Sequence, residues 1–85
     1  NKIELSDKGL IDRILEEMKK EYAAEEINDI DGVKISFESK RQWVHLRRSN
    51  TEPIIRIYSE APTLAAAEAL ANEVIAIAKK VINNK

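Results

Sequence analysis

A short run of arginine and hydroxyl residues near the middle of the chain has the chemistry of a phosphate site. The run is Arg47-Arg48-Ser49-Asn50-Thr51-Glu52-Pro53. Arginine grips phosphate oxygens through two parallel hydrogen bonds, and serine and threonine hydroxyls each donate one more. Asparagine tolerates left-handed backbone, so amides around Asn50 can turn inward as an anion-binding concavity. The run predicts a cradle for one phosphate, and the alternative is a polar hairpin turn with solvated arginines.

Positive charge is concentrated around this run, although the whole chain is nearly neutral. Residues 40–56 hold five cations against one acid, Glu52, which gives this window a net charge of +4. The five cations are Lys40, Arg41, Arg47, Arg48 and Arg56. The rest of the chain has nine cations against fourteen acids, a net charge of −5. A local positive site in an acidic domain favours a small anion over a long polyanion.

Length and composition limit what the chain can be. Its 85 residues suffice for one compact domain, and 44% hydrophobic with 34% charged residues indicates a folded globular chain. A net charge of −1 disfavours a generic nucleic-acid binder. The chain has no cysteine, which excludes disulfides and thiolate metal sites, and the lone His45 does not indicate a metal site.

No part of the sequence indicates a membrane or a secretory route. No apolar run approaches the roughly 18 residues that span a bilayer, and no basic-then-apolar leader opens the chain. The chain starts at Asn1, in the middle of a pattern, so we expect an excised domain of a longer protein.

Two amphipathic helices are predicted at the two ends of the chain. From Ser6, which can cap the first turn, apolar residues recur on one side of a 3.6-residue helix as far as Tyr22. Pro62 and Thr63 signal the start of a second helix that continues to Val81, with small alanines for close packing.

Between these helices the apolar period changes to two, which is typical of half-buried strands. Four strands are predicted, with a tight hairpin at Asp31-Gly32 between the first two. The strands are residues 27–29, 33–37, 42–48 and 54–59. The apolar face of the strands consists of Val33, Ile35, Phe37, Val44, Leu46, Ile55 and Ile57.

This order of elements predicts an α+β two-layer sandwich, with a four-stranded antiparallel sheet and both helices on one face. Residues 1–5 are either a further strand or a linker. The opposite face mixes aromatic residues with cations, including Trp43, His45 and Tyr58.

Two segments resemble the C-terminal domain of the α-D-phosphohexomutases. They are Asp31-Gly32-Val33-Lys34-Ile35 and residues 43–61. The second contains the family's phosphate-loop pattern, Arg-x-Ser-(Asn or Gly)-Thr-x-Pro between two strands, and every position of the pattern is matched. The resemblance extends with lower specificity over the predicted helices.

The resemblance implies a role for each loop residue. Such enzymes place four domains around one cleft, and the last domain, here residues 1–85, has a TBP-like fold and holds the substrate phosphate that is not transferred. The phosphate-contacting positions are matched by Arg47, Ser49, Asn50 and Thr51. The loop-shaping or supporting positions are matched by Glu52, Pro53 and Arg56. Arg48 falls at the variable position, where its side chain alternates to the other face of the strand.

The resemblance also implies an activity for the longer protein. The enzymes are cytoplasmic and interconvert hexose 1-phosphate and hexose 6-phosphate through a phosphoserine and a bisphosphorylated intermediate. Asn50 favours the phosphomannomutase/phosphoglucomutase branch, and phosphoglucosamine mutase, which usually has glycine there, is the alternative. The chain lacks the family's active-site serine, metal and sugar loops, so Mg²⁺ belongs to another domain, no catalytic residue is expected here, and the isolated chain should be inactive.

The expected partners are therefore a hexose phosphate and the other domains of the same chain, with no nucleic acid and no membrane. A hypothesis of a different class is a non-catalytic RNA or protein interaction module that stacks bases on Trp43 and Tyr58. The order of elements is not that of an RNA-recognition module, and the acidic remainder of the chain repels a nucleic-acid strand. Packing against a neighbouring domain is the favoured role of these aromatic residues.

Overall fold

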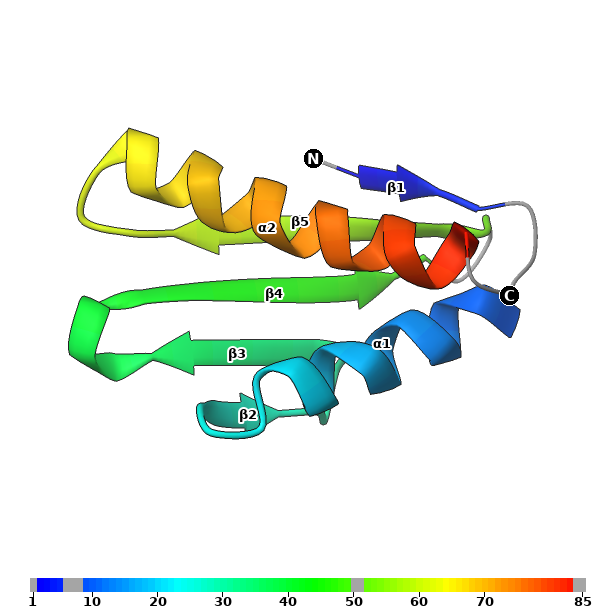
Figure 1. The fold of residues 1–85 in the computed structure, drawn as a ribbon, viewed down its shortest axis with the longest axis horizontal. Helices are drawn as coiled ribbons and strands as arrows, with labels where there is room; N and C mark the ends of the chain where they lie inside the picture. Colours follow the sequence, from blue (N-terminus) through cyan, green and yellow to red (C-terminus); the bar gives the residue numbers. More distant parts are fainter. Residues whose placement is uncertain (1, 6–8, 50–51, 84–85) are drawn as a thin grey trace.

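The strands of the protein form a single antiparallel sheet (Figure 1). The computed structural model describes residues 2–5, 9–49 and 52–83. The elements are β1 (Lys2–Glu4), α1 (Gly9–Glu21), β2 (Glu26–Asn28), β3 (Val33–Phe37), the 3₁₀ turn η1 (Glu38–Lys40), β4 (Gln42–Arg48), β5 (Ile54–Glu60) and α2 (Leu64–Asn83). The strand order is β1-β5-β4-β3-β2. The two longest strands, β4 and β5, lie at the centre and carry the predicted phosphate loop between them.

The sheet has five strands, so the prediction of four was wrong. The additional strand is β1, which pairs with β5 so that Lys2 faces Arg56 and Ile3 faces Ile55. Ile3 is buried in the core. Three residues contain too few repeats to show a period of two, and therefore the sequence left this segment open.

Both helices cover the same face of the sheet and pack against each other, as expected (Figure 1). All the residues predicted for the apolar face of the strands are buried. Helix α1 buries Leu10, Ile11, Ile14, Leu15 and Met18, and α2 buries Leu70, Ala71, Val74 and Ala78. Thr63 caps α2, because its Oγ1 accepts a hydrogen bond of 3.1 Å from the amide of Ala66. The cap predicted at Ser6 lies outside the described residues.

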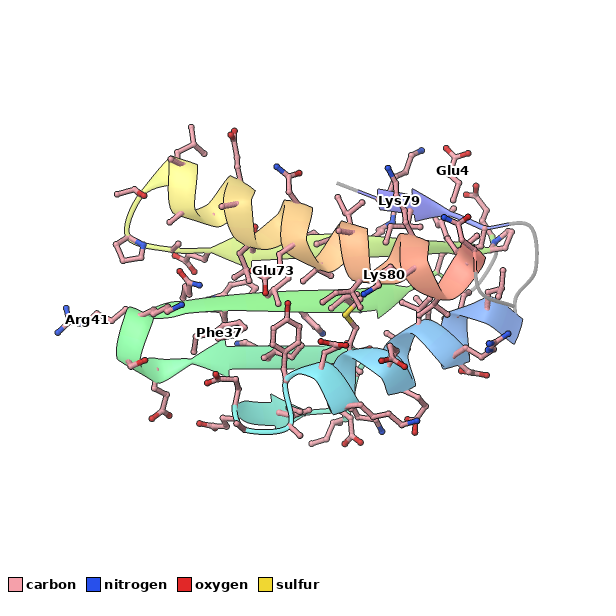
Figure 2. All side chains as sticks on the ribbon, in the orientation of Figure 1. Glu4, Phe37, Arg41, Glu73, Lys79 and Lys80 are labelled. Atoms are coloured by element: carbon pink, nitrogen blue, oxygen red, sulfur yellow. The ribbon has the colours of Figure 1, made fainter. Side chains whose placement is uncertain are left out.

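Tyr22, just beyond the end of α1, joins this helix to α2 and to the sheet. Its hydroxyl donates a 2.7 Å hydrogen bond to Oε1 of Glu73 on α2, and its ring meets that of Phe37 edge-on at 5.3 Å. Glu73 and Phe37 are labelled in Figure 2. Burial of the phenol, followed by the hydrogen bond to Glu73, raises the pKa of Tyr22 above its usual value.

The turn between β2 and β3 is one residue longer than the prediction, which left residues 30–32 between the two strands. It spans residues 29–32, and of Asp31 and Gly32 only the glycine has a positive φ, of 75°. A Cβ at Gly32 would lie 2.1 Å from the carbonyl oxygen of Leu46, so the turn is pressed against β4. Asn28 shapes its other side, because Oδ1 accepts a 3.0 Å hydrogen bond from the amide of Ile30.

Candidate phosphate-binding site

The loop after β4 lies at the end of the sheet where β3 begins and β1 ends (Figure 1). Its base is closed by a 3.2 Å hydrogen bond that the amide of Ser49 donates to the carbonyl oxygen of Ile54. The amide of Ile54 donates to Glu52, and the amide of Leu5 donates to Pro53, each over 2.8 Å. Backbone hydrogen bonds to β5 and to Leu5, the residue after β1, therefore hold both ends of this loop.

The predicted phosphate ligands fall on this loop and on the strand before it. Ser49 is half-buried directly after β4, and its amide is already used to close the loop. Any concavity of inward amides must therefore be built from residues after Ser49. Asn50 and Thr51, the two predicted ligands that follow, lie outside the described residues. Glu52 is exposed and Pro53 half-buried, and both contribute backbone carbonyls to the loop's hydrogen bonds.

Arg47 and Arg48 leave β4 on opposite faces, as alternation predicts. Arg47 is on the open face and forms an ion pair with Asp31, with 3.2 Å between Nη2 and Oδ2. Arg48 is on the helix side, where its guanidinium pairs with the carboxylate of Asp12 on α1. Of these two arginines, Arg47 is therefore the one on the open face of the sheet, where it can contribute to the candidate site.

A cationic row (Lys2, Arg56 and Arg47) crosses three strands of the open face beside the loop. Lys2 of β1 faces Arg56 of β5, and Arg56 faces Arg47 of β4. Paired residues on neighbouring antiparallel strands point to the same side with Cβ atoms about 5 Å apart. Sequence reasoning missed Lys2, because the pairing of β1 with β5 carries no local signal.

The aromatic part of the open face is engaged within the chain. The ammonium of Lys34 lies 4.6 Å from the centre of the Trp43 ring, and Nε1 of Trp43 donates a 3.0 Å hydrogen bond to Glu60. Tyr58 remains 46% exposed. Because one face of the indole is covered by a cation, the arrangement does not favour the alternative in which Trp43 stacks on nucleic-acid bases.

His45 fixes the β2–β3 turn to β4. Its Nε2 lies 2.6 Å from the carbonyl oxygen of Asp31. A carbonyl oxygen only accepts hydrogen bonds, so Nε2 carries the proton. His45 therefore has a positioning role beside Arg47 and Gly32.

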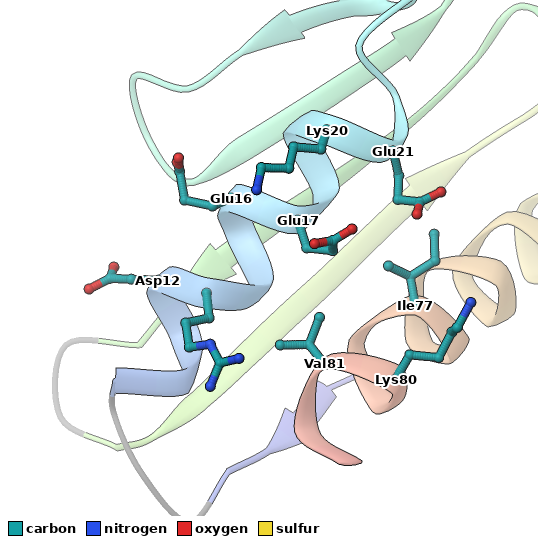
Figure 3. Close-up of a pocket in the computed structure, with 9 residues that line it drawn as sticks. Asp12, Glu16, Glu17, Lys20, Glu21, Ile77, Lys80 and Val81 are labelled. Atoms are coloured by element: carbon teal, nitrogen blue, oxygen red, sulfur yellow. The ribbon is translucent and has the colours of Figure 1, made fainter. Parts of the chain in front are cut away.

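Two grooves flank the helices. One, of about 490 Å³, runs between α1 and α2 and is lined by mixed charges that include Glu17, Lys20 and Lys80 (Figure 3). Neither Arg47 nor Ser49, the two predicted phosphate ligands that the structure describes, lines it. The other, of about 600 Å³, lies between α1, the β2–β3 turn and the end of β4, and both Arg47 and Arg48 line it. Each cation that lines this second groove is paired with an acid. Hydrogen bonds to Glu16 and Asp29 raise the pKa of Lys19.

Residues 2–5, 9–49 and 52–83 contain neither a metal-binding cluster nor a membrane-spanning helix. Within these ranges, no three acidic or histidine side chains gather as a metal site. No helix there has the length and apolar character to cross a bilayer.

Comparison with known proteins connects this chain to one family. Residues 2–77 match the family model described as phosphoglucomutase/phosphomannomutase, C-terminal domain. The chain is 41% identical over 64 residues to a probable phosphoglucosamine mutase of Methanocella arvoryzae. The matched segment is 75% of this chain and 14% of that protein. The chain is 37% identical to a protein of the same description from Pyrococcus horikoshii, over 95% of this chain and 17% of the relative.

A third relative is named phosphoglucosamine/phosphogalactosamine mutase and comes from Sulfurisphaera tokodaii. It is 35% identical over 99% of this chain and 18% of its own length. The chain thus spans less than a fifth of the length of these curated relatives.

Proposed function

Because the chain belongs to the family of phosphoglucomutase/phosphomannomutase C-terminal domains, we propose that it holds the phosphate of a hexose phosphate in a phosphohexomutase. The observation that carries this proposal is the meeting of Arg47, Ser49 and the cationic row at one exposed end of the sheet. A guanidinium and a hydroxyl there offer charge-assisted and neutral hydrogen bonds to phosphate oxygens. In this proposal Asn50 and Thr51 complete the phosphate ligands, and Glu52, Pro53 and Arg56 shape or support the loop.

These groups recognise a phosphate and not a sugar, which suits a mutase. The bisphosphorylated intermediate must turn end for end, and a site that ignores the orientation of the sugar accepts either of its phosphates. Binding energy remote from the reacting atoms then holds a sugar hydroxyl in line with the phosphoserine of another domain. The contribution of this domain is to position the substrate, and the isolated chain should be inactive.

The other parts of the reaction belong to the rest of a longer, four-domain cytoplasmic protein. Mg²⁺ supplies charge stabilisation during phosphoryl transfer, and this chain's described residues offer no cluster that fits the ion. Its expected partners are the substrate and the other domains of the same chain.

The sugar is a second question within the same proposal. Asparagine at position 50 of the phosphate-loop pattern favours glucose and mannose phosphates as substrates. The relatives described above are instead named probable phosphoglucosamine mutases. Their names favour a hexosamine phosphate as substrate. Comparing kcat/KM of the longer protein for glucosamine, mannose and glucose phosphates decides between these sugars.

The proposal is tested by titrating the 85-residue chain with inorganic phosphate while recording backbone amide NMR spectra. The expected result is a shift of the amide signals of residues 47–52, and Arg47→Ala should weaken phosphate binding about tenfold. Arg41→Asn is the matched control, because it removes the same charge at the opposite end of the sheet, where Arg41 extends away from the body (Figure 2). Asparagine suits the left-handed backbone of this residue, whose φ is 53°.

A single-stranded oligonucleotide serves as the competing ligand in the same experiment. If the oligonucleotide moves the amides around Trp43 and Tyr58 while phosphate moves none near Arg47, the interaction module replaces the mutase as the function.

A further inference from the structure

We propose that Asp31 is the resting counter-ion of Arg47, and that its carboxylate competes with the substrate phosphate for the guanidinium. The inference rests on the proposed role of Arg47 and adds a residue that sets how tightly the site holds its ligand. Asp31 is not part of the phosphate loop; it comes from the β2–β3 turn and reaches the site across the end of the sheet.

The ion pair between these residues is close and open to solvent. Oδ2 of Asp31 lies 3.2 Å from Nη2 of Arg47, and the two side chains are 70% and 50% exposed. Among the described residues, Arg47 makes no other ion pair. A ligand can therefore reach the guanidinium, and among the described acids it must compete with Asp31.

The turn that carries Asp31 is built onto β4 at three successive residues. His45 holds the carbonyl oxygen of Asp31 through Nε2, the carbonyl of Leu46 packs against Gly32, and Arg47 pairs with the carboxylate. A freely moving loop would place the acid near Arg47 only part of the time. These contacts fix the backbone of Asp31, so its carboxylate stays within reach of Arg47.

The charges around Arg47 explain why a resting counter-ion is useful. Arg47 lies directly opposite Arg56, whose other neighbour is Lys2, and like charges in this arrangement repel. Asp31 reduces that repulsion with one negative charge while the site is empty. A phosphate dianion brings two negative charges, so it can displace the carboxylate from the guanidinium. The competition weakens binding and speeds release, as a site that must accept each end of an intermediate in turn requires.

The turn also contains a matched control for this proposal. Asp29 is in the same turn and is also exposed, but its carboxylate pairs with Lys19 of α1 at 3.3 Å instead of with Arg47. Replacing either aspartate by asparagine changes the net charge by the same amount. A direct effect on Arg47 is expected only from Asp31, whereas a general electrostatic effect is expected from both.

The experiment measures the affinity of the 85-residue chain for inorganic phosphate by amide NMR in Asp31→Asn, Asp29→Asn, Arg47→Ala and the double variant Asp31→Asn/Arg47→Ala. The dispersion of each spectrum shows whether the variant is folded. Asp31→Asn should bind phosphate about threefold more tightly than the parent, the size expected for one exposed ion pair. Asp29→Asn should change the affinity much less, and Asp31→Asn should have no effect when Arg47 is absent.

Each outcome separates this inference from the proposed function. Unchanged or weaker binding by Asp31→Asn, an equal gain in Asp29→Asn, or a gain that persists without Arg47 overturns the role of Asp31 and leaves the phosphate site standing. If Arg47→Ala binds phosphate as well as the parent does, the assignment of Arg47 fails, and the inference fails with it.

Discussion

Arg47 and Arg56 face each other on the two central strands of the sheet, with their side chains on the same open face. Two guanidinium groups at this spacing repel, so the sheet carries an electrostatic cost at this point. Such a cost is explained if the two arginines serve to attract an anion. Removing one of them should then stabilise the free domain and weaken its binding of the anion.

Replacing Arg56 by glutamine should stabilise the free domain and weaken its affinity for phosphate. The loss of like-charge repulsion is worth about 0.2–1 kcal/mol, which a rise in melting temperature would report. Phosphate affinity, measured by titration, should fall because one cation of the row is gone. Arg41→Asn, at the other end of the sheet, should leave the affinity unchanged. A drop in melting temperature on Arg56→Gln would contradict the repulsion and assign the residue a structural role.

Replacing Arg47 in the longer enzyme should reduce substrate use more than stability. Arg47→Ala removes charge-assisted hydrogen bonds of roughly 1.5–3 kcal/mol, so kcat/KM should fall about tenfold or more. Arg47→Lys keeps the charge but not the planar fork, so it should recover only part of the activity. Steady-state kinetics and melting curves check both statements. A severe loss of thermal stability with unchanged kinetics would show that the arginine is structural.

The Tyr22–Glu73 hydrogen bond should make stability depend on alkaline pH. Burial and the Glu73 carboxylate raise the pKa of Tyr22 above its unfolded value of about 10. Above about pH 10 the unfolded chain loses this proton while the folded chain keeps it, so the free energy of unfolding falls as pH rises. Tyr22→Phe should lower the free energy of unfolding by about 1 kcal/mol at neutral pH. In this variant the free energy of unfolding should also fall less steeply as the pH rises.

Urea unfolding from about pH 8 to about pH 11 measures the difference between the two proteins. Tyr58→Phe is the control, because Tyr58 lies on the open face and is 46% exposed. If Tyr22→Phe and the parent declined in parallel over this range, the hydrogen bond to Glu73 would not be linked to stability.

Replacing Gly32 by alanine should destabilise the domain strongly. The new Cβ would lie 2.1 Å from the carbonyl oxygen of Leu46, and the positive φ adds strain of about 1 kcal/mol or more. Gly9→Ala makes the same chemical change in α1, where alanine favours helix by about 0.5–1 kcal/mol. Chemical denaturation of both variants gives the comparison. Similar stabilities for the two would mean that the β2–β3 turn can move away from β4.

Periodic segments were predictable from the sequence, and short ones were not. The helices and strands β3, β4 and β5 follow apolar repeats long enough to read, and β2 is indicated by the turn residues Asp31 and Gly32 that follow it. The limits of these four predicted strands agree with the structure to within one residue. The three residues of β1 contain no readable repeat, and their pairing with β5 depends on tertiary contacts. Arg41, which follows η1, has a left-handed backbone conformation. The sequence does not predict it, because glycine and asparagine are the residues that usually adopt this conformation.

The candidate site was predictable only in its linear part. The loop from Arg47 to Pro53 is contiguous, so its side-chain chemistry predicts a phosphate site from the sequence alone. Lys2, Asp31 and His45 come from separate strands and turns. Strand pairing places Lys2 beside Arg56, and the β2–β3 turn brings Asp31 to His45 and Arg47. Sequence spacing carries no information about such neighbours, which is why the sequence predicts phosphate ligands in the loop but does not predict the ion pair between Arg47 and Asp31.

The two outermost strands, β1 and β2, are each only three residues long and bear charged side chains, among them Glu4 and Glu26. A long, flat, apolar margin would invite other chains to add strands and begin aggregation. In this sheet the long strands lie in the interior. A strand from another molecule would therefore find few backbone groups to pair with at either edge. This arrangement should favour solubility of the domain at high concentration.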